Sequence, residues 1–134
     1  MARAFAGVMK AVCVEDLVVY QKAVAAAAEV AKILKRPCFQ QDRRLFDQLS
    51  GSTDAVPSLI SEGFGQSTDR QFAQCLYKSK SESKETRTHL TVAKGRDYIS
   101  ENELTDLCSR YHEIEKMTTG LIRHLQREDR KFRG

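Results

Sequence analysis

Histidines and the acidic residues near them are the first places to look for catalytic or metal chemistry. A dinuclear metal site in a helical bundle needs Glu-x-x-His pairs on facing helices. None of the three histidines has a carboxylate three positions before it; they are His89, His112 and His124. Glu85 and His89 lie one helical turn apart, but a single pair of this kind is more typical of a surface hydrogen bond. The histidine spacing therefore gives no basis for a metal site.

Motifs for nucleophilic or phosphate chemistry are also missing from the sequence. There is no G-x-S-x-G segment and no glycine-rich loop followed by Lys-Ser or Lys-Thr. The cysteines are far apart and form no C-x-x-C pair, so we expect free thiols: Cys13, Cys38, Cys75 and Cys108. A small hydrolase or metal enzyme is the third hypothesis. The first two hypotheses, a nucleic-acid-binding protein and a protein-interaction scaffold, involve no catalysis. We predict no catalytic residue, cofactor or metal.

Positive charge is more informative than any catalytic pattern. Residues 66–96 carry a net charge of +4, residues 97–122 a net charge of −4, and residues 123–134 a net charge of +3. Clusters of Lys and Arg are typical of surfaces that bind phosphate backbones. The leading candidates are Arg123, Arg127, Arg130, Lys131 and Arg133. The secondary candidates are Lys78, Lys80, Lys84 and Arg87.

Two kinds of partner match this charge pattern. The leading hypothesis is structured RNA or DNA, bound with a steep salt dependence and little sequence preference, because no aromatic base-reading motif accompanies the cations. The competing hypothesis is an acidic protein partner, which would make the chain an interaction scaffold. A simpler interpretation pairs the acidic and basic helices across a solvated surface, where each exposed pair is worth about 0–1 kcal/mol.

Four amphipathic segments must position these charges. Apolar residues recur at three- and four-residue steps over residues 15–36, 42–65, 68–95 and 100–127. Asp42, Thr68 and Ser100 are good N-caps, Pro37 ends the first helix, and Pro57 should kink the second without breaking it. Short links favour antiparallel neighbours. The sequence thus predicts an all-α, up-down-up-down four-helix bundle over residues 15–127, with a flexible arm at 1–14 and a basic tail at 128–134.

Each helix should bury one stripe of side chains. For the first helix the predicted stripe is Leu17, Tyr20, Val24, Ala28, Ala31 and Leu34. For the third it is unusually small and polar: Phe72, Leu76, Ser79, Ser83, Thr86, Leu90 and Ala93. For the fourth it is Leu104, Leu107, Tyr111, Ile114, Met117 or Thr118, Leu121 and Leu125. Because small side chains allow close approach, we predict tight packing between the alanine-rich first helix and the third. The alternative is that the third helix is exposed.

Bulk composition indicates a soluble protein. The 134 residues are 41% hydrophobic and 30% charged, which is typical of a globular domain. No apolar run approaches the roughly 18 residues that span a membrane. The N-terminal residues lack the pattern of a signal peptide. We therefore expect a cytoplasmic protein with no membrane partner.

Three segments, taken in order, resemble the 23S rRNA-intervening-sequence proteins. Residues 15–23, Glu-Asp-Leu-Val-Val-Tyr-Gln-Lys-Ala, are similar to that family's F-x-D-L-x-V-[WY]-Q-x-A start. Residues 55–65 match its S-I-P-x-N-I-A-E-G-x-G segment at Pro57, Ile60, Glu62, Gly63 and Gly65. Residues 72–90 follow its third-helix pattern at Phe72, Leu76, Glu85, Thr88 and Leu90. The chain departs from it at Ser50-Gly51, where the family often has Arg-Arg.

The resemblance implies a small bacterial four-helix bundle that assembles as a ring-like homopentamer and has no established catalytic activity. A relative of this family, the accessory protein of diversity-generating retroelements, binds a reverse transcriptase and nucleic acid, which is the model for the scaffold hypothesis. For Glu62 two interpretations stay open. It faces a neighbouring subunit, or it makes a local contact at the helix end beside Gly63.

Overall fold

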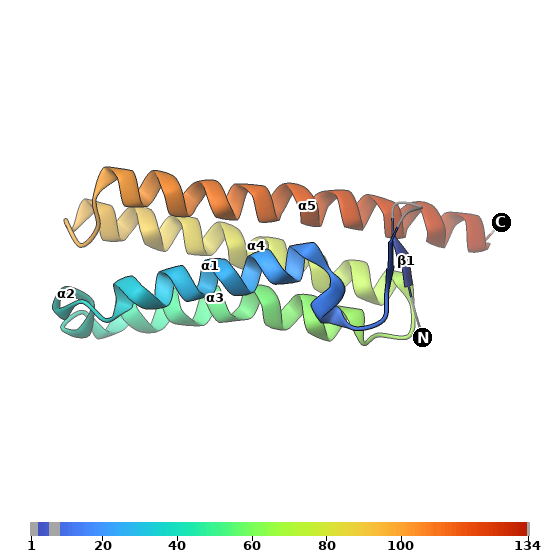
Figure 1. The fold of residues 1–134 in the computed structure, drawn as a ribbon, viewed down its shortest axis with the longest axis horizontal. Coiled ribbons are helices and arrows are strands. Elements are labelled where there is room, and N and C mark those ends of the chain that lie inside the picture. The colour runs from blue at the N-terminus through green and yellow to red at the C-terminus, as the bar shows by residue number, and fades with distance from the viewer. Residues whose placement is uncertain (1–2, 6–8, 134) are drawn as a thin grey trace.

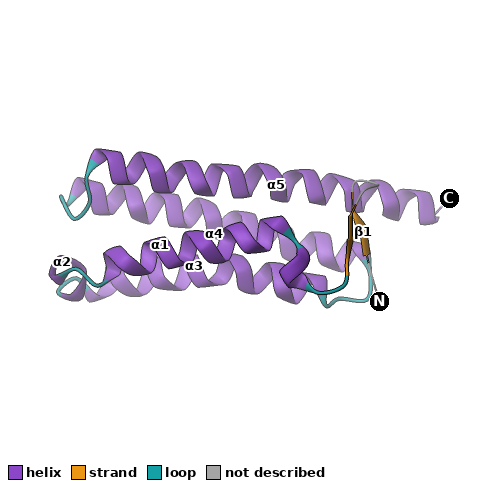
Figure 2. Ribbon diagram, in the orientation of Figure 1, coloured by secondary structure: helices purple, strands orange, loops and turns teal. Residues whose placement is uncertain are grey.

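Four long helices dominate the computed structural model, which describes residues 3–5 and 9–133 and the side chains of residues 11–131. The elements in chain order are β1 (Arg3–Phe5), β2 (Met9–Ala11), the 3-10 turn η1 (Val14–Asp16), α1 (Val18–Leu34), α2 (Pro37–Gln40), α3 (Arg43–Phe64), α4 (Asp69–Gly95) and α5 (Glu101–Arg133). Figure 1 shows the four long helices side by side, and Figure 2 shows the strands confined to the N-terminal end of the chain. The four predicted helices are therefore present.

Neighbours along the chain are neighbours in space. Helix α3 packs against α4, α4 packs against α5, and α1 packs against both α3 and α5. The colours in Figure 1 place the end of each long helix beside the start of the next, so consecutive helices run in opposite directions. Short connections favour this antiparallel packing.

Helix starts follow the predicted caps. The Asp42 carboxylate accepts a hydrogen bond from the Leu45 amide (3.3 Å), and the Thr68 hydroxyl accepts one from the Gln71 amide (3.2 Å). At Ser100 the capping box is complete, because the Glu103 amide donates to the Ser100 hydroxyl and the Ser100 amide donates to the Glu103 carboxylate. These three predictions are confirmed.

The start of the first helix differs from the prediction. Residues 14–16 form η1, and α1 begins at Val18. The Asp16 carboxylate accepts hydrogen bonds from the amides of Val12 (2.9 Å) and Cys13 (3.2 Å), which stabilises a separate turn before the helix. These two bonds lower the pKa of Asp16 below its usual range.

The stripe predicted for α4 is buried at every position, including Ser79, Ser83 and Thr86. An exposed α4 is thus excluded. For α5 the prediction left the choice between Met117 and Thr118 open. Thr118 is the buried residue, and Met117 is only half-buried.

The stripe predicted for α1 is wrong in its centre. Val24, Ala28 and Ala31 are exposed, and the buried positions are Val19, Ala23, Ala26, Val30 and Ile33. Alanine and valine occupy both faces of this helix, so periodicity could not fix which face turns inward.

The predicted tight packing between α1 and α4 is also wrong. These two helices lie diagonally across the bundle, and the small residues of α4 serve its contacts with α3 and α5 instead. The Ser79 hydroxyl donates to the Val56 carbonyl of α3 (2.8 Å), and the Thr86 hydroxyl donates to the Ser52 hydroxyl of the same helix (2.9 Å).

The segments outside the bundle also have structure. In the predicted N-terminal arm, β1 and β2 pair antiparallel, with Arg3 opposite Ala11. Residues 128–133, predicted to be part of a tail, continue α5 without interruption. The basic C-terminal residues are therefore carried on a helix, which fixes their spacing.

Candidate nucleic-acid interface

A hollow of about 420 Å³ lies on the surface between α4 and α5, and three cations line it together with His112 and Glu115. Lys80 comes from α4, and Lys116 and Arg123 come from α5. Thr119 and Gly120 lie between Lys116 and Arg123 on α5. The space at Gly120 is open, since an added Cβ there would have nothing within 4 Å. We call this hollow, with Lys80, Lys116 and Arg123, the basic groove.

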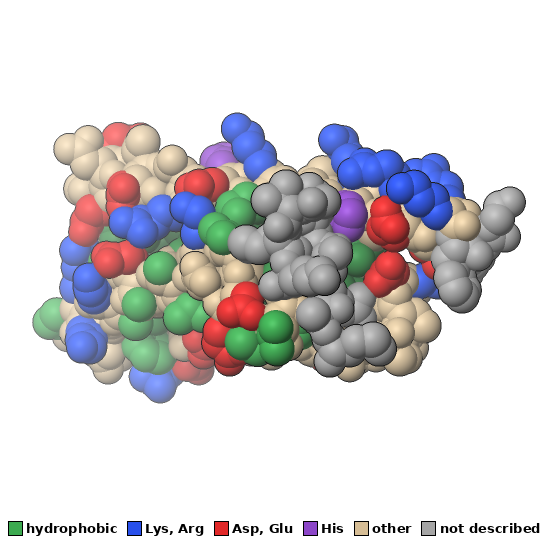
Figure 3. All heavy atoms as spheres, turned by 45° about the vertical axis from the view of Figure 1, so that its right-hand side comes forward, with side chains coloured by type: hydrophobic (Ala, Val, Ile, Leu, Met, Phe, Trp, Pro, Cys, Tyr) green, Lys and Arg blue, Asp and Glu red, His purple; other side chains and the backbone are tan. Residues whose placement is uncertain are grey.

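The cations of α5 continue from the basic groove along one side of the helix. Lys116, Arg123, Arg127 and Arg130 are separated by seven, four and three residues, which places them on one helical face. All four are exposed. Figure 3 shows Lys and Arg side chains gathered along the edge of the molecule towards the C-terminal end of α5. Helical continuity thus turns a sequence cluster into a row of cations.

Arg87 was predicted as a secondary phosphate contact, but it belongs to a different arrangement. Its Nε donates to Oε2 of Glu115 (2.8 Å), and its Nη2 donates to Oε1 of the same carboxylate (2.9 Å). The Ser83 hydroxyl donates to the same Glu115 Oε2 (2.8 Å). This bidentate pair commits Arg87 to α5, so we do not count it among the open cations.

The charge state of Glu115 follows from these contacts. Burial raises the pKa of its carboxyl group, but the hydrogen bonds from Arg87 and Ser83 outweigh burial and hold the pKa below its usual range. The same pair raises the pKa of Arg87. Glu115, which also lines the basic groove, is therefore a carboxylate at neutral pH and balances the charge of Arg87.

The remaining candidates are placed unevenly. Lys78 and Lys84 are exposed on α4, outside the residues that line the basic groove. Lys131 is exposed, and its Nζ lies 3.3 Å from Oε1 of Glu128. Arg133 belongs to α5, but its side chain lies outside the described residues.

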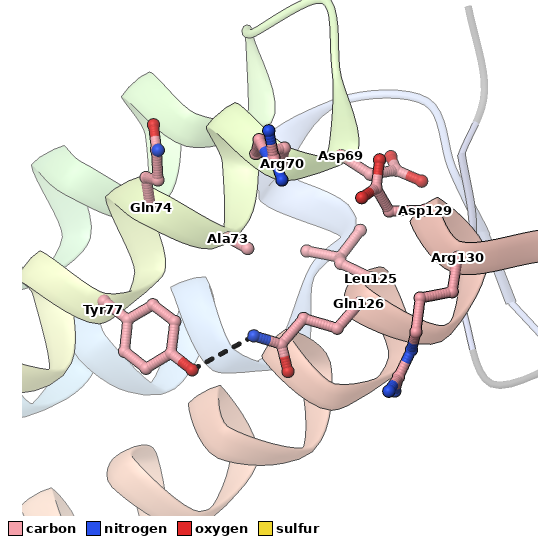
Figure 4. A pocket seen from close by; sticks show the side chains of 9 residues that line it. All are labelled: Asp69, Arg70, Ala73, Gln74, Tyr77, Leu125, Gln126, Asp129 and Arg130. Carbon is pink, nitrogen blue, oxygen red and sulfur yellow. Dashed lines mark hydrogen bonds between the residues drawn. The ribbon is translucent and has the colours of Figure 1, made fainter. Parts of the chain in front are cut away.

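A second hollow, of about 450 Å³, lies further along the same α4–α5 seam, where α4 begins. Figure 4 shows Tyr77 of α4 beside Gln126 of α5, with Leu125 next to them and Arg130 on the α5 side. The Gln126 amide donates to the Tyr77 hydroxyl (3.2 Å). We call this the Tyr77 hollow.

Sequence reasoning missed three residues of this seam: Lys116, His112 and Tyr77. His112 and Lys116 line the basic groove, and Tyr77 is the exposed aromatic of the second hollow. Their spacing could have revealed two of them, because His112 and Lys116 precede Arg123 on the same helical face. Nothing local indicated that Tyr77 would face α5.

The Glu85–His89 pair lies elsewhere, in a hollow between α3 and α4 that Glu82 and Asp47 also line. Within residues 3–5 and 9–133, no three His, Cys, Asp or Glu side chains gather where they could hold a metal ion. The four cysteines are unpaired, as predicted. Burial is the main reason that the pKa of the Cys75 thiol is raised, which disfavours its reactive thiolate.

The segment around Glu62 has a steric role. A Cβ at Gly63 would lie 2.7 Å from Cβ of Cys75 and 2.8 Å from Cδ1 of Phe72. Only glycine therefore lets α3 and α4 approach this closely. Glu62 itself is exposed, and its carbonyl accepts a hydrogen bond from the Gln66 side chain (3.4 Å).

Fold and surface together describe a helical-bundle protein with a basic seam between its last two helices. The chain belongs to the 23S rRNA-intervening sequence protein family, whose model matches residues 15–120. It also resembles a crystal structure from Bacteroides thetaiotaomicron, described as a protein of unknown function from the S23 ribosomal protein family. That likeness has a TM-score of 0.72 at 21% identity and covers 78% of this chain and 98% of the other. At this identity it supports the fold.

The comparison with curated proteins gave no match. In the part of the chain that the structure describes, no helix is long and apolar enough to cross a membrane.

Proposed function

We propose that this protein is a non-enzymatic, homo-oligomeric bundle that binds structured RNA or DNA through the basic groove and the adjoining cations of α5. The observation that carries the proposal is the convergence of Lys80, Lys116 and Arg123 on one hollow, continued by Arg127 and Arg130 along one helical face. Such a row can contact successive phosphates without reading the bases. The names of the family and of the solved relative, which refer to 23S rRNA and to a ribosomal protein family, favour RNA.

The charge balance along the seam supports this choice. Arg87 is neutralised by Glu115. The cations of the row on α5 are exposed, and Lys80 on α4 is half-buried. An exposed row of like charges repels itself, and an anionic backbone would relieve that repulsion. Binding should therefore weaken steeply as salt rises.

The test compares two double variants that lose the same charge. Arg123→Gln/Arg127→Gln removes cations of the row, and Lys35→Gln/Arg44→Gln removes exposed cations of the α1–α3 end. Affinity for a labelled structured RNA would be measured by fluorescence anisotropy at several salt concentrations. We expect the first variant to bind more weakly, with a salt slope lower by about two, and the second to bind like the wild type.

Equal losses in both variants would mean that net charge and not the seam attracts RNA. No binding by the wild type at low salt would remove the nucleic-acid proposal. The acidic protein partner, as for a reverse-transcriptase accessory factor, would then be the hypothesis to pursue.

The outer face of α1 supports the oligomer, which is tested as the pentamer that the family resemblance implies. Val24 is 44% exposed and Val18 is 39% exposed, and Ala25, Ala28 and Ala31 are exposed on the same side of the helix, which Gln21 and Lys32 share. A second copy of the chain would cover it. Light scattering should give about five times the 15.2 kDa chain mass. Val24→Lys should reduce that mass, and Val92→Lys, an exposed valine on α4, should not.

A further inference from the structure

Tyr77 is half exposed at the α4–α5 seam, where most large apolar side chains are buried. Its exposed fraction is 50%, and it lines the Tyr77 hollow of about 450 Å³. Ala73 and Leu125 give the hollow an apolar lining. The Gln126 amide holds the phenol by its hydroxyl, so one aromatic surface is presented at a fixed place.

Cations lie on both sides of this aromatic ring along the seam. Arg130 lines the same hollow. Lys80 follows Tyr77 by one turn of α4, and Arg123 precedes Gln126 by one turn of α5; both line the basic groove. A nucleic-acid strand that follows these cations must therefore pass Tyr77.

The charges that line the Tyr77 hollow cancel, so they give a phosphate no net attraction at this point. Asp69 and Asp129 line its far side, next to each other and away from Tyr77 (Figure 4). Arg70 and Arg130 line the same hollow and balance these two carboxylates, so the lining as a whole has no net charge to attract a phosphate, and a neutral base enters it without a charge penalty.

We infer that the Tyr77 hollow receives an unpaired nucleobase, which stacks on Tyr77 while the flanking phosphates contact Arg130, Arg123 and Lys80. This inference rests on the proposed function and specifies its ligand as single-stranded or looped nucleic acid. Stacking on an aromatic side chain tolerates any base, because every base has a π-face. A continuous duplex offers no base for the hollow.

The first experiment measures affinity for two RNAs of equal charge, an unstructured strand of about 12 nucleotides and a blunt duplex. Three proteins are compared: wild type, Tyr77→Phe and Tyr77→Leu. We expect tighter binding of the single strand than of the duplex, about tenfold weaker single-strand binding by Tyr77→Leu, and near wild-type binding by Tyr77→Phe, which keeps the ring. Duplex binding should be the same in all three.

The second experiment uses Tyr77→Trp as a reporter, because the chain contains no tryptophan. Single-stranded RNA should quench its fluorescence, and the duplex should not. An unstructured DNA strand, run in parallel, tells whether the sugar matters to the site.

Failure of this inference can be told apart from failure of the proposed function. If wild type binds RNA and the Arg123→Gln/Arg127→Gln variant does not, but Tyr77→Leu binds single strands normally, the base site is wrong and the groove stands. If Tyr77→Leu changes the mass of the assembly in light scattering, Tyr77 belongs to a subunit contact and the inference is overturned. If no RNA binds at low salt, both proposals fall.

Discussion

Helix α4 packs against its two neighbours by different means. Towards α3 the contact is steric and neutral: Gly63 fits against Phe72 and Cys75, and the Ser79 hydroxyl donates to the Val56 carbonyl. Towards α5 the contact is charged, through the Arg87–Glu115 pair, and it opens into two hollows along the seam. Both interfaces have surface hollows, but they differ in charge: acidic side chains line the hollow between α3 and α4, whereas mainly cations line the basic groove between α4 and α5.

The largest expected effect on stability is at the Arg87–Glu115 pair between α4 and α5. Arg87→Met would leave the Glu115 carboxylate buried with only the Ser83 hydroxyl as its partner. Removing one member of such a pair costs about 3 kcal/mol of unfolding free energy, which chemical denaturation would measure. Arg87→Met/Glu115→Leu should recover part of that loss, because the unpaired charge is gone. A single variant as stable as the wild type would contradict the proposed importance of the pair.

The steric side is tested by two glycine substitutions in α3. Gly63→Ala should cost about 1–3 kcal/mol, because Cys75 and Phe72 must move apart from the new methyl group. Gly51→Ala is the matched control, since nothing lies within 4 Å of its added Cβ. It should stabilise the helix by about 0.5–1 kcal/mol. Thermal or urea unfolding that shows equal effects at both positions would refute the close α3–α4 approach.

A smaller effect is expected at the neutral hydrogen bond between α4 and α3. Ser79→Ala removes the donor to the Val56 carbonyl and should cost about 1 kcal/mol. Denaturation midpoints at pH 7 would measure the difference. RNA affinity should not change, because Ser79 is buried away from the seam. A loss of RNA binding without unfolding would show that the two sides of α4 are not independent.

The smallest expected effect is a change in how stability depends on pH. The pKa of Glu115 is lower in the folded state than its unfolded value of 4.5. Its contribution to the free energy of unfolding is therefore complete above pH 4.5 and is lost as pH falls through the folded-state pKa. Glu103, whose pKa Arg36 lowers to about 2, acts in the same direction at the far end of the bundle. As the pH is lowered from 7 to 3, the urea midpoint of unfolding should decrease less for Glu115→Gln than for the wild type. The urea midpoint of Ser79→Ala should decrease in parallel with that of the wild type. Parallel plots of midpoint against pH for all three proteins would contradict the prediction.

Local patterns carried the prediction of the fold a long way. The caps at Asp42, Thr68 and Ser100 involve atoms three residues apart, so the sequence contains both partners. The stripe of α4 was predictable because Phe72, Leu76 and Leu90 recur at helical spacing and fix the inner face, although the positions between them are small and polar. The stripe of α1 was not, since Val24 and Val30 are alike and lie on opposite faces.

The candidate surface was predicted only as a set of charges. Arg123, Arg127 and Arg130 were recognised from their crowding in the sequence, and helix α5 gave them a common face. Arg87 could not be told apart from them, because its partner Glu115 is 28 residues away.

The sequence by itself determined the four long helices, the caps that start three of them and the sign of the charge on the last two, because these depend on bonds and composition within a few residues. Tertiary structure decided which face of α1 is buried, which helices are neighbours of α4, and which cations remain open to a ligand. Those outcomes depend on contacts between segments that are distant in the chain, where packing and burial choose among alternatives that local spacing leaves equal.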